Sequence, residues 1–505
     1  MSNRNRDRNG KLPGIDRRTL LMGMGATALG GAMGWSLSTP LGRALAAVGP
    51  QPELTQPPQE VSSEGMLRVG MEAIYGRYDL AGRPVMLRSF DGGPLGRTLR
   101  VQAGDQLRLS LHNRLPYDPL EALCTAVPAS GENVPRGFNV TNMHLHGLHV
   151  SPKSPSDNVL LLIRHDEQQH YIYDIPEDQP PGTYFYHAHF HGSVSLQVAG
   201  GMAGALIVEG EVDRIPEIRA AREQVIVFQT QRFDSDGLCE DYRILAEPGP
   251  VYINGQLRPL IRMQPGEVQR WRLVNAGHQM NMELSLDDHL FTALCYDGNP
   301  LPETRQVEQV PLVPGNRADL LVKAGKPGRY PLVVGRDADG RPLVAADIEV
   351  GGEAMDMPLF SGALPGRALL RDIRDEEVTF GRRLEFGLAG NISGDKYTIN
   401  GLPFSCEDPW LIPLGAVEEW EVYNHTAESH PFHIHVNPFQ MLSGGNVPPG
   451  TWLDTVNLAP FQRIRFRTRF EDYTGTFVFH CHNLTHEDLG MMQAIRVVDS
   501  PGRLA

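Results

Sequence analysis

An all-β chain of three related sandwich domains is predicted from two repeated sequence patterns. The first is a turn glycine, then residues of alternating polarity, then an asparagine nine positions after the glycine. Its three copies lie about 150–160 residues apart, at 104–113, 266–275 and 415–424. Alternation with a period of two between turn residues is typical of a half-buried strand. Three copies at this spacing predict three related β-domains.

The second pattern ends each repeat and sets the middle one apart. A turn glycine opens a β-rich run, and the residue five positions later is His187 in the first copy, Val333 in the second and His480 in the third. The first and third copies thus carry potential metal ligands where the middle copy is aliphatic. The middle domain is therefore predicted to have the same fold as the other two domains but no metal site.

Length and composition agree with three domains. The chain has 505 residues, and a domain averages roughly 150. Glycine and proline are plentiful but dispersed, which suits short strands joined by turns, and only a short helix near 216–224 is expected. Pro- and Gly-rich joins near 209–216 and 351–367 mark the boundaries. The predicted domains are 65–212, 213–365 and 366–505.

Residues 1–46 are predicted to be an export signal rather than part of the fold. Arg17 and Arg18 follow a basic stretch and precede a weakly apolar, Gly-rich run to about Trp35, and an Ala-x-Ala cleavage site follows at 44–46. The arginine pair predicts a twin-arginine signal, hence a periplasmic or secreted protein that uses the twin-arginine export machinery. A retained membrane anchor is the alternative, disfavoured because glycines dilute a run already short for a bilayer.

Without this signal the remaining chain is strongly acidic. The signal holds seven Lys and Arg against two Asp, so its removal changes the net charge from −14 to −19. A body this acidic is a poor candidate for binding nucleic acid or an anionic membrane. No later stretch reaches about 18 uninterrupted apolar residues, so no membrane span is expected after the signal.

Ten of the eighteen histidines gather in four short clusters. They are His144 and His146; His187 and His189; His430, His433 and His435; and His480, His482 and His486. A lone histidine is usually an ordinary core or surface residue. On a strand, however, residues i and i+2 point to the same face, so each His-x-His pair presents two imidazoles to one point. Four such pairs predict a metal site.

One ligand set has the composition of a blue-copper site. Cys481 with two histidines, His430 and His486, and the following Met491 form a His₂Cys set with a weak axial thioether. Zinc prefers a closed tetrahedral set, and the methionine disfavours it.

Strand parity links this set to a second site. Cys481 points to one face of its strand, whereas His480 and His482 point to the other. The backbone thus connects the blue copper to the remaining histidines. Eight of these remain, enough for three coppers with two, three and three ligands. Three coppers beside a one-electron relay can store the four electrons that reduction of O₂ to water requires.

These four blocks, in this order, resemble the multicopper oxidase family, which includes laccases, bilirubin oxidases and cuprous oxidases. The resemblance covers residues from about 65 to 500. It implies three cupredoxin-like Greek-key β-sandwich domains and four copper ions, with a three-copper cluster between domains one and three. The type 1 ligands would be His430, Cys481, His486 and Met491. The type 2 ligands would be His144 and His433. The type 3 ligands would be His146, His187 and His482 for one copper, and His189, His435 and His480 for the other.

The chain departs from the usual family pattern in three places. Val436 stands where a glycine is usual after the third block, Leu145 where tryptophan is common, and a longer segment, 118–140, precedes the first block. None of these removes a ligand. An axial methionine, rather than leucine or phenylalanine, implies a lower type 1 potential within the family.

Reducing O₂ to water consumes four protons, so buried carboxylates are expected near the cluster. Glu487 directly follows His486, where the family often has an acid, and Asp157 resembles the family's acid near the type 2 copper. For both, a solvated loop acid is the alternative. Asp454 lies in a stretch that resembles one beside the type 1 histidine. It is interpreted either as a contact for a phenol or an incoming cuprous ion, or as structural.

The resemblance implies an oxidase that couples four one-electron oxidations of a small donor, such as a phenol or aromatic amine, to reduction of O₂ to water. A cuprous oxidase acting in copper tolerance is the alternative. A non-catalytic scaffold is a third hypothesis, disfavoured because every ligand is present. Copper nitrite reductases are related but lack the eight-histidine cluster. The loops around the type 1 site do not identify the donor.

The cysteines divide into one predicted ligand and four others. Cys481 is expected to stay unpaired. An oxidising compartment would permit disulfides among Cys124, Cys239, Cys295 and Cys406, with a pairing that the sequence does not determine.

Overall fold

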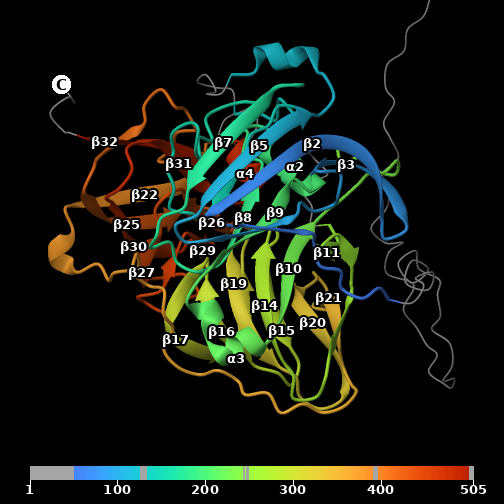
Figure 1. The fold of residues 1–505 in the computed structure, drawn as a ribbon. Coiled ribbons are helices and arrows are strands. Elements are labelled where there is room, and N and C mark those ends of the chain that lie inside the picture. The colour runs from blue at the N-terminus through green and yellow to red at the C-terminus, as the bar shows by residue number, and fades with distance from the viewer. Residues whose placement is uncertain are drawn as a thin grey trace, which may run out of the picture. The chain divides into compact units, whose positions relative to one another are not determined.

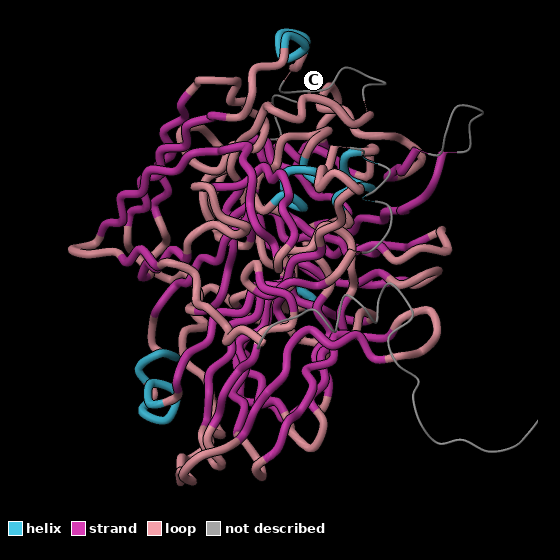
Figure 2. Tube along the Cα trace, turned by 90° about the vertical axis from the view of Figure 1, so that its right-hand side faces the viewer, coloured by secondary structure: helices cyan, strands magenta, loops and turns pink. Residues whose placement is uncertain are grey.

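The computed structural model describes residues 51–125, 133–240, 242, 245, 249–389 and 396–499. The predicted export signal, 1–46, lies outside the described residues. The chain from Gln51 onward forms one compact unit. It is built almost wholly of strands, with a few short helices among the loops (Figures 1 and 2), and the predicted all-β fold is confirmed. No helix in these ranges is long and apolar enough to cross a membrane.

Two sheets, in the orders β1-β4-β9-β8-β6 and β3-β2-β5-β7, form the N-terminal sandwich. Their inner faces share one hydrophobic core, which includes Leu109 of β5 and Leu206 of β9. The strands are β1 (Gln59–Val61), β2 (Met66–Leu80), β3 (Arg83–Phe90), β4 (Thr98–Gln102), β5 (Gln106–Arg114), β6 (His144–His146), β7 (Gln168–Asp174), β8 (Gly182–His187) and β9 (Ala203–Glu209).

The middle sandwich has sheets in the orders β12-β11-β10-β14-β19-β16-β17 and β13-β21-β20-β15-β18 around the largest core, with Trp271 fully buried in it. The strands are β10 (Arg222–Thr230), β11 (Val251–Ile253), β12 (Gln256–Leu257), β13 (Leu260–Met263), β14 (Val268–Asn275), β15 (Met282–Leu286), β16 (Phe291–Tyr296), β17 (Asn299–Val307), β18 (Gln309–Leu312), β19 (Arg317–Lys323), β20 (Gly328–Arg336) and β21 (Pro342–Val350).

The C-terminal sandwich has sheets in the orders β23-β22-β25-β30-β27-β28 and β24-β32-β31-β26-β29, with Trp420 at the centre of its core. The strands are β22 (Phe380–Ala389), β23 (Lys396–Ile399), β24 (Trp410–Pro413), β25 (Ala416–Asn424), β26 (His430–Ile434), β27 (Phe439–Ser443), β28 (Trp452–Leu453), β29 (Thr455–Leu458), β30 (Arg463–Phe470), β31 (Gly475–Cys481) and β32 (Met492–Val498).

Helices are short, as expected for this fold. The helix expected near 216–224 is present but ends earlier, as α3 (Pro216–Ala220), because β10 begins two residues later. The others are α2 (Val194–Gly200), α4 (Leu484–Asp488), and the 3-10 turns η1 (Pro119–Leu123), η2 (Val212–Arg214) and η4 (Asp375–Glu377).

The first sequence repeat corresponds to one strand of each sandwich, β5, β14 and β25. Each pairs in parallel with an earlier strand of its own sheet (β2, β10 and β22) and in antiparallel with a later one (β7, β19 and β30). The turn glycine before each strand has a left-handed φ, between +79° and +89°, a conformation that L side chains rarely adopt.

The asparagine that ends the repeat explains why the pattern recurs. Asn113, Asn275 and Asn424 are fully buried. Each side-chain amide donates to carbonyls of a neighbouring loop, and each side-chain oxygen accepts the backbone N–H two residues later. The asparagine therefore satisfies backbone groups that the end of the strand would leave unpaired.

All five cysteines lie in the described ranges, and all are free thiols. The disulfides that the sequence permitted are therefore absent from this structure. The reason is distance within the fold, because Cys124, Cys239, Cys295 and Cys406 lie in or against four different hydrophobic clusters.

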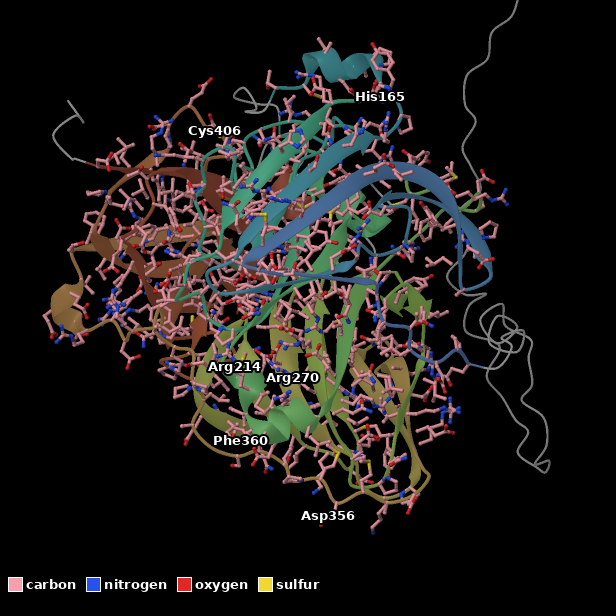
Figure 3. All side chains as sticks on the ribbon, in the orientation of Figure 1. His165, Arg214, Arg270, Asp356, Phe360 and Cys406 are labelled. Carbon is pink, nitrogen blue, oxygen red and sulfur yellow. The ribbon has the colours of Figure 1, made fainter. Side chains whose placement is uncertain are left out.

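An ion-pair network joins the N-terminal and middle sandwiches. Arg272 of β14 is fully buried and pairs with Asp213, Glu223 and Asp319 at 2.6–2.9 Å. Arg270, labelled in Figure 3, pairs with two of the same acids. The N-terminal sandwich contributes Arg100, which pairs with Glu223, and Thr183, which donates to Asp319.

Candidate metal centres

Strand pairing brings the predicted histidines together in the N- and C-terminal sandwiches. In the first, β6 pairs with β8, which sets His144 opposite His187. In the second, β26 pairs with β31, which sets His433 opposite His480. The rings of His144 and His433, from β6 and β26, lie with centroids 5.9 Å apart, so the two sandwiches meet here.

Eight histidines of the two sandwiches form one buried cluster, and none is more than 2% exposed. The rings of His144 and His435 stack across the seam with centroids 3.8 Å apart, and those of His146 and His433 stack at 3.7 Å. The members are His144, His146, His187, His189, His433, His435, His480 and His482.

In four rings of this cluster, one nitrogen is anchored and the other has no hydrogen-bond partner. Nδ1 of His144 lies 2.8 Å from Asp157, and its Nε2 is unpartnered. Nδ1 of His187 lies 2.9 Å from a backbone carbonyl, and its Nε2 is likewise unpartnered. His433 is anchored through Nδ1 and His146 through Nε2. A neutral imidazole that donates through one nitrogen keeps a lone pair on the other, as metal ligands do.

In other rings of the eight-histidine cluster, the imidazole nitrogens face one another. Nε2 of His480 lies 3.3 Å from Nε2 of His189 and 3.2 Å from Nε2 of His435. Both nitrogens of His482 lack a hydrogen-bond partner. Its ring lies with centroids 4.9 Å from His146 and 5.5 Å from His187.

The smaller predicted group also assembles. Nδ1 of His430 lies 3.0 Å from Nδ1 of His486, and the sulfur of Cys481 lies 3.5 and 3.8 Å from these two nitrogens. Met491 is fully buried beside them, and its backbone carbonyl accepts the N–H of Cys481. Nε2 of His430 is held by Thr426 at 2.7 Å.

Strand β31 connects the two groups in the way its alternation predicts. Cys481 faces His430 and His486, whereas the adjacent His480 and His482 belong to the eight-histidine cluster.

The donor chemistry fits copper. Burial lowers the pKa of His187 and His189 to about 3, so these two imidazoles are neutral at neutral pH. Metal binding requires neutral imidazoles, and buried nitrogens without partners are costly unless a ligand satisfies them. Imidazoles with one thiol and one thioether form a set that selects copper.

Two of the predicted acids lie in the interior beside the clustered histidines. Glu487 is fully buried, with carboxylate oxygens 3.0 Å from Nδ1 of His480 and 3.6 Å from Nδ1 of His189. Asp157 is 3% exposed and accepts from His144 and from the N–H of Leu145. Burial raises the pKa to about 7 for Glu487 and about 8 for Asp157. Neither is a solvated loop acid.

Asp454 is also buried beside the clustered histidines. It is 2% exposed and accepts two hydrogen bonds from the Arg317 guanidinium, at 2.8 and 2.5 Å. Its carboxylate also lies 3.0 Å from His146 and 3.5 Å from His433. A carboxylate enclosed in this way favours the structural alternative for Asp454.

Several residues near these centres were not anticipated from the sequence. Tyr397 stacks on His486, with ring centroids 3.9 Å apart, and its hydroxyl donates to Glu428. Glu428 lies 3.4 Å from Nε2 of His486. Arg317 and Gly315, from the middle sandwich, reach the eight-histidine cluster. No motif in the sequence marks these residues, since each contact joins separate parts of the chain.

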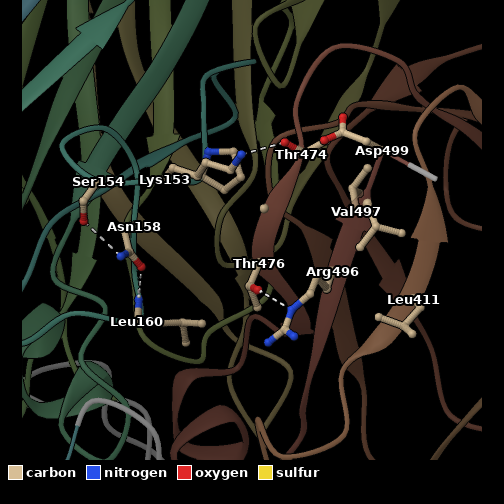
Figure 4. Close-up of a pocket in the computed structure, with 13 residues that line it drawn as sticks. Lys153, Ser154, Asn158, Leu160, Leu411, Thr474, Thr476, Arg496, Val497 and Asp499 are labelled. Carbon is tan, nitrogen blue, oxygen red and sulfur yellow. Dashed lines mark hydrogen bonds between the residues drawn. The ribbon is translucent and has the colours of Figure 1, made fainter. Parts of the chain in front are cut away.

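A cavity of about 1050 Å³ opens between the loop after β6 and strands β31 and β32 (Figure 4). Ser154 and Asn158 line it on the loop that carries Asp157, and Lys153 reaches across to Thr474 of the C-terminal part. The loop that holds the buried Asp157 carboxylate therefore has one side on a solvent-accessible space.

The fold and the two ligand groups together define a copper-dependent oxidoreductase. Sequence models of the multicopper oxidase family match residues 136–213, 228–350 and 378–501. The chain therefore belongs to the multicopper oxidase family.

Known relatives cover most of the chain. A multicopper oxidase of Staphylococcus haemolyticus is 26% identical over 428 residues, which cover 81% of this chain and 83% of that protein. A laccase of Haloferax volcanii is 26% identical over 459 residues, which cover 82% of this chain and 78% of that protein. The solved structure of a multicopper oxidase from Campylobacter jejuni, described as a metallo-oxidase, has the same fold, with a TM-score of 0.72 at 24% identity and coverage of 90% of this chain and 96% of its own.

Proposed function

We propose that this protein is a laccase-like oxidase that passes electrons from a small donor, such as a phenol or aromatic amine, to O₂. The copper ions, when bound, supply one-electron acceptance at the type 1 position and four-electron reduction of O₂ to water at a trinuclear position. The observation that carries the proposal is the set of buried, unpartnered imidazole nitrogens facing a shared space and joined by β31 to a Cys-His-Met group.

We propose four copper ions in all, held by the ligand sets that the family resemblance implies. The type 1 position takes His430, Cys481, His486 and Met491. The type 2 position takes His144 and His433, each through Nε2, which has no partner in the protein. The type 3 positions take His146, His187 and His482 on one side, and His189, His435 and His480 on the other.

The chain's own groups then have separate tasks. Cys481 and its two flanking histidines provide a continuous covalent path for electrons between the two positions. Glu487 lies beside the rings of His480 and His189, and Asp157 lies beside the ring of His144. Because the reaction consumes four protons, these carboxylates are the proposed groups that hold and deliver protons there.

The proposed entry point for electrons is the edge of His486. Glu428, with its side chain 49% exposed, and Tyr397 lie against this ring. A carboxylate at this point can accept the proton of a phenol or bind a metal cation. The second candidate function, oxidation of Cu(I), rests on the same carboxylate, and the Campylobacter jejuni relative is described as a metallo-oxidase.

The first experiment counts copper and records the visible spectrum, followed by oxygen-electrode assays. Four copper ions per chain, a blue absorption and O₂ uptake with 2,6-dimethoxyphenol are expected. A copper-loaded preparation that stays colourless and takes up no O₂ would establish the scaffold alternative instead.

The variant Glu428→Gln separates the two donors. It keeps the side-chain shape and removes the charge. For a phenol oxidase, kcat/KM for 2,6-dimethoxyphenol falls about 10-fold, the effect of one lost charge-assisted hydrogen bond, with little change for Cu(I). For a cuprous oxidase the larger loss is with Cu(I). Glu385→Gln, a control on an exposed carboxylate paired with His425, changes neither.

We further infer that the three sandwiches are domains with the predicted bounds 65–212, 213–365 and 366–505, except that the first also includes β1 (Gln59–Val61). We also infer that residues 1–46 direct export to the periplasm or the medium. Replacing both arginines of the pair, Arg17 and Arg18, by lysine tests the second inference. The expected result is retention of the unprocessed protein in the cytoplasm, measured by fractionation.

A further inference from the structure

The middle sandwich supplies no imidazole to the cluster, yet it touches the cluster directly. Gly315, in the turn before β19, has φ +89°. A methyl group at its Cα would lie 3.0 Å from ring carbons of His482 and 3.1 Å from Cε1 of His146. Two of the proposed type 3 ligands therefore pack against the backbone of a domain that carries no ligand.

Two residues after Gly315, Arg317 places a positive charge on the same side of the histidine cluster. Its side chain is fully buried, and its guanidinium makes a two-pronged pair with Asp454 at 2.8 and 2.5 Å. The remaining guanidinium hydrogens go to the carbonyls of Gly315, Asp297 and Thr183. Arginine forms such planar, two-pronged pairs in a fixed orientation, which lysine does not.

The carboxylate held in this way contacts histidines of both outer sandwiches. Asp454 lies 3.0 Å from Nε2 of His146, and it accepts from the Thr455 hydroxyl at 2.8 Å. That hydroxyl lies 3.1 Å from Nδ1 of His433. The nitrogens on the opposite sides of these rings, Nδ1 of His146 and Nε2 of His433, are unpartnered and face the cluster.

Asp297, also of the middle sandwich, fixes the backbone on which Asp454 sits. It is fully buried and accepts the backbone N–H groups of Asp454 and Thr455, at 3.3 and 3.1 Å, as well as that of Arg317 at 3.0 Å. Both the side chain and the main chain of Asp454 are therefore held by the middle sandwich.

We propose that Arg317 and Asp297 of the middle sandwich are positioning residues for the trinuclear copper site, acting through Asp454 to fix which nitrogens of His146 and His433 face the metal. This inference rests on the function proposed above. It assigns the ligand-free middle domain a part in metal binding, in addition to its part in the fold.

The test compares Arg317→Lys and Arg317→Gln with the wild-type protein after copper loading. Outer partners of metal ligands contribute about 10–100-fold to metal affinity. Copper retention at the type 2 position, measured by chelator competition and the type 2 signal in electron paramagnetic resonance, is expected to fall by this factor in Arg317→Gln. The blue type 1 absorption stays unchanged, and Arg317→Lys recovers part of the loss because it keeps the charge.

Two further variants separate positioning from folding. Arg270→Lys alters an equally buried arginine of the same sandwich that pairs with Asp213 and Asp319 and with no histidine, so wild-type copper binding is expected. Gly315→Ala changes no charge but intrudes on His482 and His146, and it should perturb the type 3 pair.

Two results would overturn the inference. One is an Arg317→Lys protein with wild-type copper retention and an unchanged type 2 signal. The other is an equal loss in Arg270→Lys, which would show that any damage to the middle sandwich releases copper. Failure of the proposed function itself looks different, because the wild-type protein would then show no type 2 signal at all.

Discussion

At the scale of single residues, the histidine cluster depends on the groups that hold the outer nitrogen of several of its imidazoles. Asp157 holds His144, Asp454 holds His146, and the carbonyl of Ala188 holds His187. Each anchor selects one tautomer, because the held nitrogen donates and the other keeps its lone pair. The anchors therefore determine which atom can bind metal.

Asp157→Asn tests this role. The amide can still accept from His144 but cannot ionise as the carboxyl group can, so copper affinity at the proposed type 2 position is expected to fall about 10–100-fold. The measurement is copper retained per chain during dialysis against a chelator.

A matched control is available in another Asp–His pair. Asp472 lies 2.8 Å from Nε2 of His149, outside the cluster. Asp472→Asn is expected to retain wild-type copper content. Equal copper loss in both variants would mean that Asp157 acts on overall stability rather than on His144.

At the scale of elements, the repeated strand of each sandwich ends with the same buried asparagine and the same pattern of hydrogen bonds. The buried asparagine at the end of β5, β14 and β25 donates to backbone carbonyls elsewhere in its sandwich and accepts the N–H two residues later. The asparagine is present in the middle sandwich as well, where no metal ligand requires it. Its role is therefore to satisfy the backbone groups at the end of the strand.

Asn275→Ala measures that role away from the metal. The substitution removes bonds to the carbonyls of Met280 and Leu312 and from the N–H of Gly277. Each unsatisfied buried group costs about 1–3 kcal/mol, so the free energy of unfolding is expected to fall by at least about 2 kcal/mol in urea titrations. Asn281→Ala, an exposed position with one bond to Ser429, should stay within about 0.5 kcal/mol of wild type.

At the scale of the whole molecule, charged networks occupy the seams between sandwiches. The pKa values of Asp213 and Glu223 are lowered to about 2, against burial, by the arginines Arg270, Arg272 and Arg100. Folding therefore favours the charged form of both acids. Their contribution to stability is fully present above the ordinary carboxyl pKa of about 4 and is lost as the pH falls toward 2.

Asp213→Asn isolates this effect from other titrating groups. In urea unfolding of the copper-free protein, wild type is expected to lose stability more steeply than the variant between about pH 4.5 and pH 2. The difference between the two proteins should be nearly constant above pH 5. If the plots of unfolding free energy against pH were parallel for the two proteins over the whole range, the assigned pKa shift would be contradicted.

The sequence predicted those features that depend on local periodicity. The alternation of β31 was sufficient to place Cys481 on one face and its neighbours on the other, and the three repeats indicated three sandwiches. The role of Asp454 was left open and Arg317 was missed because these two residues, which contact each other, are 137 positions apart in the sequence. Such a contact depends on how sandwiches pack, which no local pattern encodes.

The free thiols have a consequence for where the protein can mature. Since no sulfur–sulfur bond braces the described chain, folding needs no oxidant, and thiol reductants such as dithiothreitol should leave the melting temperature of the copper-free protein unchanged. A chain of this kind can complete its tertiary structure, and acquire its metal, in the reducing cytosol. That is the order of events that the proposed twin-arginine export would require.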